Sequence, residues 1–377
     1  MIHYLDNSAT TMVLPEAQEA ATHAMHEMFG NPSSLHRMGI DAARCLKESR
    51  EAAAAAMGCT AAELYFVSGG TEGINTAIFG AARKNRHLGK HIVTSAIEHA
   101  ATLQACRRLE GEGYMVTYIQ PDAEGHISAQ DVIEAIRSDT ILVTLMLVNN
   151  EVGTVLPIAE VGKALKQKCP QALFHVDAVQ GLFRVPLTPK KWNCDLMSVS
   201  GHKIGAPKGI GAFYMKREVR LAPYLVGGGQ ENGFRAGTEP MPQIAAFAAA
   251  CRVRAAQMEA DSAHVAALKA YLRQQVETYL PWTLWNGAPD IPHVVSLSLP
   301  ECKSEVMLRV LESRDVFVSA GSACSKGKES HVLRAMGLDK ARIDSALRVS
   351  FAPYNTNEDI DALVAGLQAG AKMLKRR

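Results

Sequence analysis

Residues 198–213 read SVSGHKIGAPKGIGAF, a stretch in which an apolar run passes directly into a glycine-rich loop. Lys203 lies where a buried strand should end. Three interpretations compete for it: a solvated loop cation, a lysine that binds phosphate, or a nucleophilic amine that holds a carbonyl cofactor as a Schiff base. The flanking sequence has to decide between them.

The region around this loop alternates short apolar runs with longer amphipathic stretches. The predicted strands cover residues 63–68, 91–96, 140–148, 173–179 and 195–200, and the predicted helices cover 71–84, 99–113 and 158–169. Such alternation predicts βα units around a mostly parallel, doubly wound sheet, and therefore an α/β fold. Sheets of this kind bind ligands beyond the carboxyl ends of their strands.

The pattern changes after Gly228. A turn-rich segment, GGGQENGFRAGTEP, leads into an alanine-rich stretch over residues 242–280, which predicts one long helix joining two domains. Predicted strands at 293–299 and 346–352 and predicted helices at 304–314 and 357–377 follow. This combination indicates a second, smaller α+β domain.

The composition is that of an ordinary globular protein, with 47% hydrophobic and 21% charged residues among 377. Forty basic and 38 acidic residues give a formal net charge of +2, which argues against a protein that binds nucleic acid through bulk charge. The N-terminus, MIHYLDNSATTMVLP, lacks a basic segment followed by a long apolar core, and no apolar run approaches the ~18 residues of a membrane span. We therefore expect a cytoplasmic protein without membrane contact.

Cysteine and histidine spacing gives no support for a metal site. The eight cysteines contain no C-x-x-C pair, and most lie in apolar or helical patterns typical of reduced core residues. No HExxH motif occurs, and His23 and His26 in one helical stretch have no third ligand beside them. We expect no bound metal.

Four predicted strand ends each present a different chemical group. Glycines and Thr71 in YFVSGGTEG lie at the start of a helix, where free N–H groups and the helix dipole favour an anion. The other groups, in chain order, are His99, Asp177 with Gln180, and Ser200 with His202 and Lys203. Because the strands are predicted to be parallel, these groups should meet at one edge of the sheet.

Each group also has a purely structural interpretation. The Gly-Gly-Thr turn can be a helix start with a threonine cap, and no Walker A or GxGxxG motif accompanies it. Asp177 can be a buried carboxylate satisfied by backbone donors, and His99 a capping or core histidine. Lys203 can be a solvated loop lysine. Taken singly, none of these residues defines a function.

Taken together, the four strand ends fit one ligand, pyridoxal 5'-phosphate. The helix start would bind the phosphate, and His99 would stack on the flat ring. Asp177 would keep the pyridine nitrogen protonated, so that the ring accepts electrons from a substrate carbanion. Lys203 would form a Schiff base with the aldehyde, since burial near positive charge makes an amine nucleophilic. The set favours the Schiff-base interpretation of Lys203.

Further motifs follow in order along nearly the whole chain: YLDNSATT at 4–11, FGNPSSLH at 29–36, VNNEVG at 148–153, RAGTE at 235–239 and LRVSF at 347–351. Together with SGGTE, HVDAVQ, SGHK and GSACS, they make the sequence resemble the cysteine desulfurases of the NifS/IscS type, which are fold-type-I pyridoxal phosphate enzymes. The resemblance implies a large cofactor-binding domain, residues 13–252, with a mostly parallel seven-stranded sheet between helices. Residues 1–12 and 253–377 would form the small α+β domain that carries the catalytic cysteine loop.

The resemblance also implies a role for each matching residue. Lys203 would hold the cofactor and act as the base for the substrate Cα proton, Asp177 would pair with the ring nitrogen, and His99 would stack on the ring and take part in catalysis. The remaining assignments are Gln180 and Asn150 near the phenolic oxygen, Gly70, Thr71, Ser200 and His202 at the phosphate, Thr238 at the phosphate of a second subunit, and Arg348 with Asn7 at the substrate carboxylate. The role of Thr238 implies a homodimer.

Cys324 lies in SAGSACSKGKES, a run of small and polar residues with little apolar surface to bury it. It is therefore predicted to be an exposed, reactive thiol, with Cys302 in LPECKSE as the second candidate. The resemblance assigns to Cys324 the attack on the substrate sulfur. The implied reaction converts L-cysteine to L-alanine and leaves a persulfide on Cys324 for a sulfur-acceptor protein of iron–sulfur cluster assembly or tRNA thiolation.

Three features depart from the housekeeping pattern of this family. Gly205 and Ala206 precede Pro207 where Tyr-Gly is frequent, the loop after Cys324 is expected to be shorter, and the sequence stops at Arg377 without the longer tail that docks an iron–sulfur scaffold. Both kinds of acceptor therefore stay open. The alternatives within the fold are a selenocysteine lyase and an aminotransferase, while the complete set of catalytic residues disfavours a non-catalytic scaffold.

Overall fold

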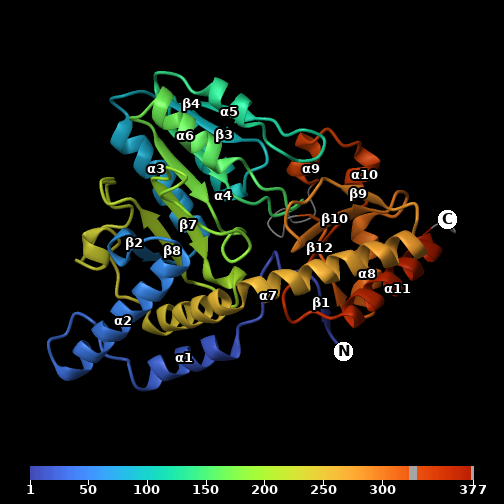
Figure 1. Ribbon diagram of the computed structural model, residues 1–377, viewed down its shortest axis with the longest axis horizontal. Helices are drawn as coiled ribbons and strands as arrows, with labels where there is room; N and C mark the ends of the chain where they lie inside the picture. The colour runs from blue at the N-terminus through green and yellow to red at the C-terminus, as the bar shows by residue number, and fades with distance from the viewer. Residues whose placement is uncertain (322–328, 375–377) are drawn as a thin grey trace.

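The computed structural model describes residues 1–321 and 329–374, and its largest feature is a sheet of seven strands (Figure 1). In chain order these are β2 (Leu64–Val67), β3 (His91–Ser95), β4 (Met115–Ile119), β5 (Thr140–Met146), β6 (Leu173–Asp177), β7 (Leu196–Ser200) and β8 (Gly211–Met215). Their order across the sheet is β2-β8-β7-β6-β5-β3-β4, and only β8 runs antiparallel to its neighbours. The predicted α/β class with a mostly parallel sheet is confirmed.

Helices connect the parallel strands, as the alternation predicted. The connecting helices are α3 (Gly70–Asn85), α4 (Ala100–Glu110), α5 (Ala129–Ala135) and α6 (Ile158–Lys168). Helices α1 (Pro15–His26) and α2 (Arg37–Ala56) precede the sheet and pack against the first part of the long helix α7 (Met241–Tyr279), along the lower left of Figure 1. The predicted helix 242–280 thus differs from α7 by one residue at each end.

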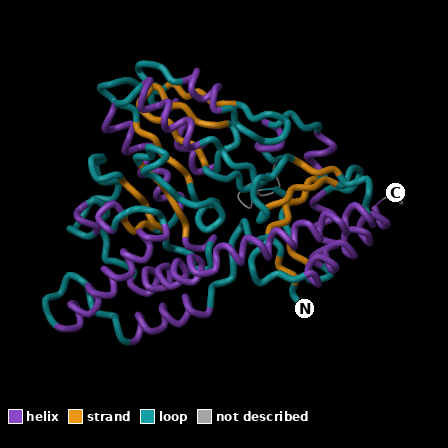
Figure 2. The backbone as a smooth tube through the Cα atoms, in the orientation of Figure 1, coloured by secondary structure: helices purple, strands orange, loops and turns teal. Residues whose placement is uncertain are grey.

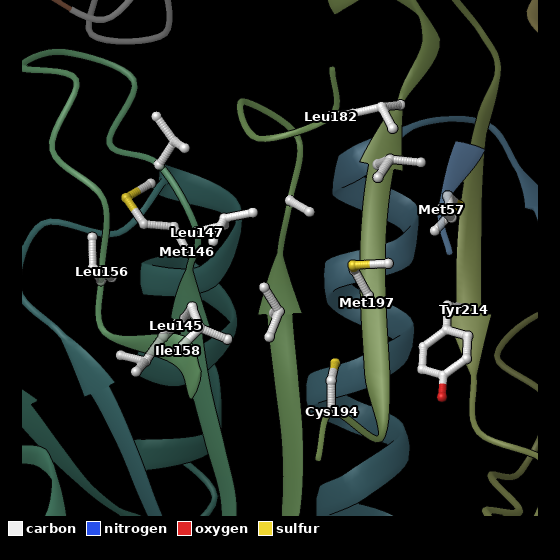
Figure 3. Packing of buried hydrophobic residues seen from close by; sticks show 14 of the residues in the cluster. Met57, Leu145, Met146, Leu147, Leu156, Ile158, Leu182, Cys194, Met197 and Tyr214 are labelled. Atoms are coloured by element: carbon white, nitrogen blue, oxygen red, sulfur yellow. The ribbon is translucent and has the colours of Figure 1, made fainter. Parts of the chain in front are cut away.

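Burial explains which strands the sequence pattern reveals. Every residue of β3, β5, β6 and β7 is buried, so these strands appear as continuous apolar runs. The edge strand β4 is partly exposed, and the glycines around β8 interrupt its apolar pattern, so neither was predicted. Figure 3 shows Leu145, Met197 and Tyr214 in the core, from β5, β7 and β8.

A smaller antiparallel sheet lies at the other end of α7, visible as the second group of orange strands in Figure 2. It has the order β12-β10-β9, with β9 (Leu284–Asn286), β10 (Val294–Ser298) and β12 (Ala346–Ser350). Near it, β1 (His3–Tyr4) pairs in parallel with β11 (Val316–Phe317). The accompanying helices are α8 (Ser304–Glu312), α9 (His331–Ala335), α10 (Lys340–Asp344) and α11 (Asn357–Leu374).

This end of the molecule has its own hydrophobic core, which contains Leu5 from the N-terminus, the later part of α7 and residues of β10, β12 and α11. The N-terminal segment therefore packs with the C-terminal third of the chain rather than with the large sheet. The domain boundaries at residues 12/13 and 252/253 stay a prediction.

Within the two described ranges, no helix combines the length and apolarity needed to cross a bilayer. The same residues contain no group of three or more His, Cys, Asp and Glu side chains placed to hold a metal ion.

Candidate active site

A cavity of about 200 Å³ lies beyond the carboxyl ends of the parallel strands. Its lining contains the predicted cofactor residues Gly70, Thr71, His99, Asn150, Asp177, Gln180, Ser200, His202 and Lys203, together with Arg348. Strands β3, β5, β6 and β7 lie side by side in the sheet, so the segments that follow them converge on one space. Thr238 and Asn7 are not among the lining residues, and Cys324 lies outside the described residues.

The start of α3 forms the part of the cavity suited to an anion. Gly69 is the N-cap, with φ 154° and no side-chain cap, and a Cβ atom at Gly70 would approach Val179 Cγ2 to 2.6 Å. The first-turn carboxylate of Glu72 accepts from the Ser68 N–H at 2.7 Å and pairs with Arg235 at 2.9 Å. No side chain at the N-cap accepts a hydrogen bond from the first N–H groups of α3. A phosphate group can therefore bind at this helix N-terminus.

Asp177 ends β6 as a carboxylate that is only 4% exposed. Its Oδ1 accepts from the Val179 N–H at 3.0 Å. Burial raises the pKa of Asp177 to about 6, opposed by this hydrogen bond and by the charge of Lys203. A carboxylate in this setting is stabilised as an anion by a cation placed against it. The protonated nitrogen of a pyridine ring is such a cation.

Lys203 follows β7 in a short 3-10 turn and contacts the N-terminal segment of the chain. Its Nζ donates to the Ser8 carbonyl at 2.5 Å and to the Ala9 carbonyl at 2.8 Å. Gln180 Nε2 donates to the same Ser8 carbonyl at 3.0 Å. The amine is thus held inside the cavity by backbone oxygens, and its charge also acts on the carboxyl groups of Asp177 and Asp6.

His99 is the N-cap of α4, and its Nδ1 accepts from the Ala101 N–H at 3.1 Å. This hydrogen bond requires an unprotonated Nδ1, so the neutral ring carries its proton on Nε2. Burial, with the charges of Lys203 and His331, lowers the pKa of His99 to about 4. The imidazole is therefore neutral near pH 7 and offers an N–H donor at Nε2.

Arg348 lies on β12 across the cavity from the large sheet and is 2% exposed. Its Nη2 donates to Asp6 Oδ1 at 2.8 Å and its Nη1 to the Asn150 carbonyl at 3.0 Å. Its Nε is buried and has no partner among the described residues. A substrate carboxylate is a natural acceptor for this donor. Asp6, in the motif YLDNSATT, was not predicted as part of the site.

The two predicted residues outside the cavity lining occupy different environments. Asn7 is fully buried and donates from Nδ2 to the Ser350 carbonyl at 2.8 Å, so it joins the N-terminal segment to β12. Thr238 is exposed in the segment before α7. Its predicted contact is with a second subunit and stays a prediction, as does the substrate contact of Asn7.

The described residues on either side of Cys324 are tied to the cavity walls. The Ser319 carbonyl accepts from the Arg348 N–H at 2.6 Å. On the other side, Ser330 donates to Glu151 at 2.5 Å, and a ring nitrogen of His331 lies 2.9 Å from the carbonyl of Glu98, the residue before His99. Cys302, the second thiol candidate, is 1% exposed, which disfavours it as a nucleophile.

Comparisons with known proteins agree with this geometry. The aminotransferase class-V family model matches residues 3–363. A curated protein named cysteine desulfurase IscS, from Methanosarcina thermophila, is 42% identical over 365 residues, covering 96% of this chain and 90% of its own. A putative cysteine desulfurase IscS 1 from Bacillus subtilis (strain 168) is 41% identical over 362 residues, covering 95% of each chain.

Solved structures show the same relationship. A NifS-like protein superposes with a TM-score of 0.94 at 32% identity and covers 99% of this chain and 100% of its own. A structure described as SspA in complex with cysteine superposes with a TM-score of 0.83 at 34% identity, covering 94% of this chain and 100% of its own. The chain therefore belongs to the class-V aminotransferase family, among its cysteine desulfurases of the NifS/IscS type.

Proposed function

We propose that this protein is a pyridoxal-phosphate-dependent cysteine desulfurase, which converts L-cysteine to L-alanine and carries the sulfur as a persulfide on Cys324. The observation that carries the proposal is the single cavity lined by His99, Asp177, Lys203 and Arg348 beside the start of α3. The family depends on pyridoxal phosphate, and its members named above include a protein solved with cysteine.

The residues of the cavity match the parts of this cofactor. Gly70, Thr71, Ser200 and His202 would hold the phosphate, Asp177 the ring nitrogen, His99 one face of the ring, and Gln180 with Asn150 the phenolic oxygen. Lys203 would hold the aldehyde carbon. The bound cofactor would supply an electron sink next to the Cα atom of the amino acid.

The side chains of this protein would bind the substrate and move its protons. Arg348 binds the carboxylate through Nε, the guanidinium atom that no described residue uses. Lys203 Nζ takes the Cα proton as a general base, because two backbone carbonyls already hold it at the cavity. His99 donates a hydrogen bond from Nε2, which the bond to the Ala101 N–H leaves as the donor atom, and so can hold a reacting group in place.

Sulfur transfer to Cys324 balances without an external oxidant. The thiolate attacks the substrate sulfur, so that a sulfur–sulfur bond forms while the carbon–sulfur bond breaks. The electron pair of the broken bond stays on the Cβ atom of the substrate, which gains a proton. L-Cysteine and one thiol thus give L-alanine and one persulfide. Ser319 and His331, the described residues that flank this segment, are bonded to Arg348 and to the Glu98 carbonyl.

We further propose that the protein acts as a cytoplasmic homodimer in which Thr238 reaches the phosphate of the partner's cofactor. Its exposed position in one protomer supports this arrangement. The persulfide would pass to an acceptor protein of iron–sulfur cluster assembly or of tRNA thiolation.

The test is alanine formation from L-cysteine by the cofactor-loaded protein in the presence of a thiol reductant. Wild type should form alanine, Lys203→Ala should lose the activity by at least about 10³-fold, and Lys208→Ala, an exposed lysine of the same loop, should keep it. Cys324→Ser should bind the cofactor but carry no protein persulfide. Absence of alanine with the wild type, or persulfide on the serine variant, would refute the proposal.

A further inference from the structure

A second, smaller cavity of about 40 Å³ lies behind Lys203, which contributes to the lining of both cavities. Its polar lining comes from segments that are distant in the sequence: Arg184 after β6, Arg254 and Asp261 on α7, and His293 just before β10. The volume corresponds to roughly three water-sized spheres of 10–15 Å³ each. The cavity is therefore large enough for a small solute but not for an amino acid.

The charges around this cavity are unbalanced. Among the described residues that line it, Asp261 is the only acidic one and pairs with Arg254 at 3.0 Å, while Arg254 Nε donates to the Ile204 carbonyl at 3.2 Å. Arg184 forms hydrogen bonds to the backbone and side-chain oxygens of Gln180, and no carboxylate in the described residues pairs with it. One guanidinium charge thus lacks a counter-charge.

The surroundings of Arg184 make this imbalance costly. Burial, together with the positive charges of Arg348 and Arg254, lowers the pKa of Arg184 to about 10. The positive charge of Arg348 is paired with the carboxylate of Asp6. Arg184 is only partly exposed, and with two other guanidinium groups near it an anion at this position is stabilised by all three charges.

His293 supplies a further donor to the same cavity. The residue is 6% exposed, and its buried Nδ1 has no hydrogen-bond partner among the described residues. Burial, Arg184 and Arg254 lower the pKa of His293 to about 3, so the ring is neutral and contributes no charge of its own. His293 lines the cavity, and a neutral imidazole with its proton on Nδ1 has one donor that no described residue uses.

We infer that the cavity behind Lys203 is a binding site for one small monovalent inorganic anion of the halide class, held by the Arg184 guanidinium and the His293 Nδ1–H. The anion supplies a counter-charge to Arg184, which Asp261 does not pair with, and satisfies the buried histidine nitrogen. Water alone would satisfy the nitrogen but not the charge. Because Arg184 also donates to Gln180 in the main cavity, the anion lies one side chain from the proposed active site.

The direct test is a crystal of the cofactor-loaded wild-type protein soaked in sodium bromide, with diffraction measured at the bromine absorption edge. We expect one anomalous peak within hydrogen-bond distance of Arg184 and of His293 Nδ1. Ordered water without anomalous signal would overturn the inference, and so would a carboxylate from a second copy of the chain at this position.

The solution test compares thermal unfolding in bromide and in gluconate at equal ionic strength, since gluconate is too large for the cavity. At a bromide concentration ten times its Kd, the unfolding midpoint of the wild type should rise by about 1–2 °C. Arg184→Met should abolish this rise, whereas Arg309→Met, which removes an exposed arginine on α8, should retain it. An equal rise in Arg184→Met would overturn the inference, and a wild type without any rise would identify the crystal peak as adventitious. If Arg184→Met does not fold, the wild-type measurements decide alone.

Discussion

The wall of the main cavity that belongs to the large sheet differs in origin from the wall opposite it. On the sheet side, Asp177 ends a strand, and His99 and Lys203 follow strand ends by a few residues. On the opposite side, Asp6 and Arg348 are 342 residues apart in sequence and meet through the packing of the N-terminal segment on β12. The positions of the residues on the first wall follow from the shared direction of the parallel strands. The second wall forms only when the N-terminal segment packs against β12.

Because of this difference, we expect a substitution on the wall formed by the large sheet to lower kcat/KM more than a substitution on the opposite wall. Asp177→Asn keeps the shape of the side chain but removes the charge that would stabilise a protonated ring. We expect kcat/KM for alanine formation to fall by about 10²–10³-fold or more, with no loss of thermal stability, because burial already raises the pKa of Asp177 to about 6.

Asp195 offers a matched control for this change. It is also buried, at 3% exposure, but lies at the opposite end of the sheet, before β7, and pairs with Lys166. Asp195→Asn should therefore lower stability and leave kcat/KM largely unchanged. If both variants lost activity to the same extent, the conclusion that Asp177 acts in the chemistry because it lies at the carboxyl end of its strand would be disproved.

A change on the opposite wall should mainly affect substrate binding. Asp6→Ala removes the acceptor that fixes Arg348 Nη2, so the guanidinium loses one of its two anchors. We expect KM for L-cysteine to rise by about 10-fold with kcat changed less than about 2-fold. A fall in kcat with unchanged KM would show that Asp6 acts in the chemical step and not in positioning Arg348.

The smallest expected effect is on the pH dependence of stability. The pKa of His99 is lowered to about 4 from an ordinary value of 6.5, so between these values the unfolded chain binds a proton that the folded chain does not. The contribution of His99 to the free energy of unfolding is therefore complete above pH 6.5. It decreases as the pH falls below this value and is lost once the pH has fallen through about 4.

His99→Asn tests this effect, because asparagine keeps an acceptor for the Ala101 N–H at the N-cap. Urea unfolding between pH 7 and pH 4 should show that the free energy of unfolding of the wild type falls more steeply than that of the variant. If the free energy of unfolding fell equally with pH in the wild type and the variant, His99 would bind its proton equally in the folded and unfolded states, and its pKa would not be lowered by burial.

The sheet side of the site was largely predictable because each of its groups follows an apolar strand. The strand at 173–179 placed Asp177, and the strand at 195–200 placed Lys203. Asp6 was missed because an acidic residue in a short N-terminal motif carries no local sign of its partner. The bond from the Asn7 side chain to the Ser350 carbonyl could not be predicted from spacing either, and the predicted substrate contact of Asn7 stays a prediction.

The sequence by itself determined the α/β class, the alternation of the buried parallel strands with helices, and the groups that follow the ends of these strands. These depend on hydrophobic periodicity and turn residues, which act over short stretches of chain. Only the tertiary structure decided which distant side chains meet: Arg348 with Asp6, Lys203 with the Ser8 carbonyl, and Arg184 near Arg254 and His293. The reason is that such contacts arise from packing the N-terminal segment, α7 and the small sheet against the strand ends, and packing is a property of the whole chain.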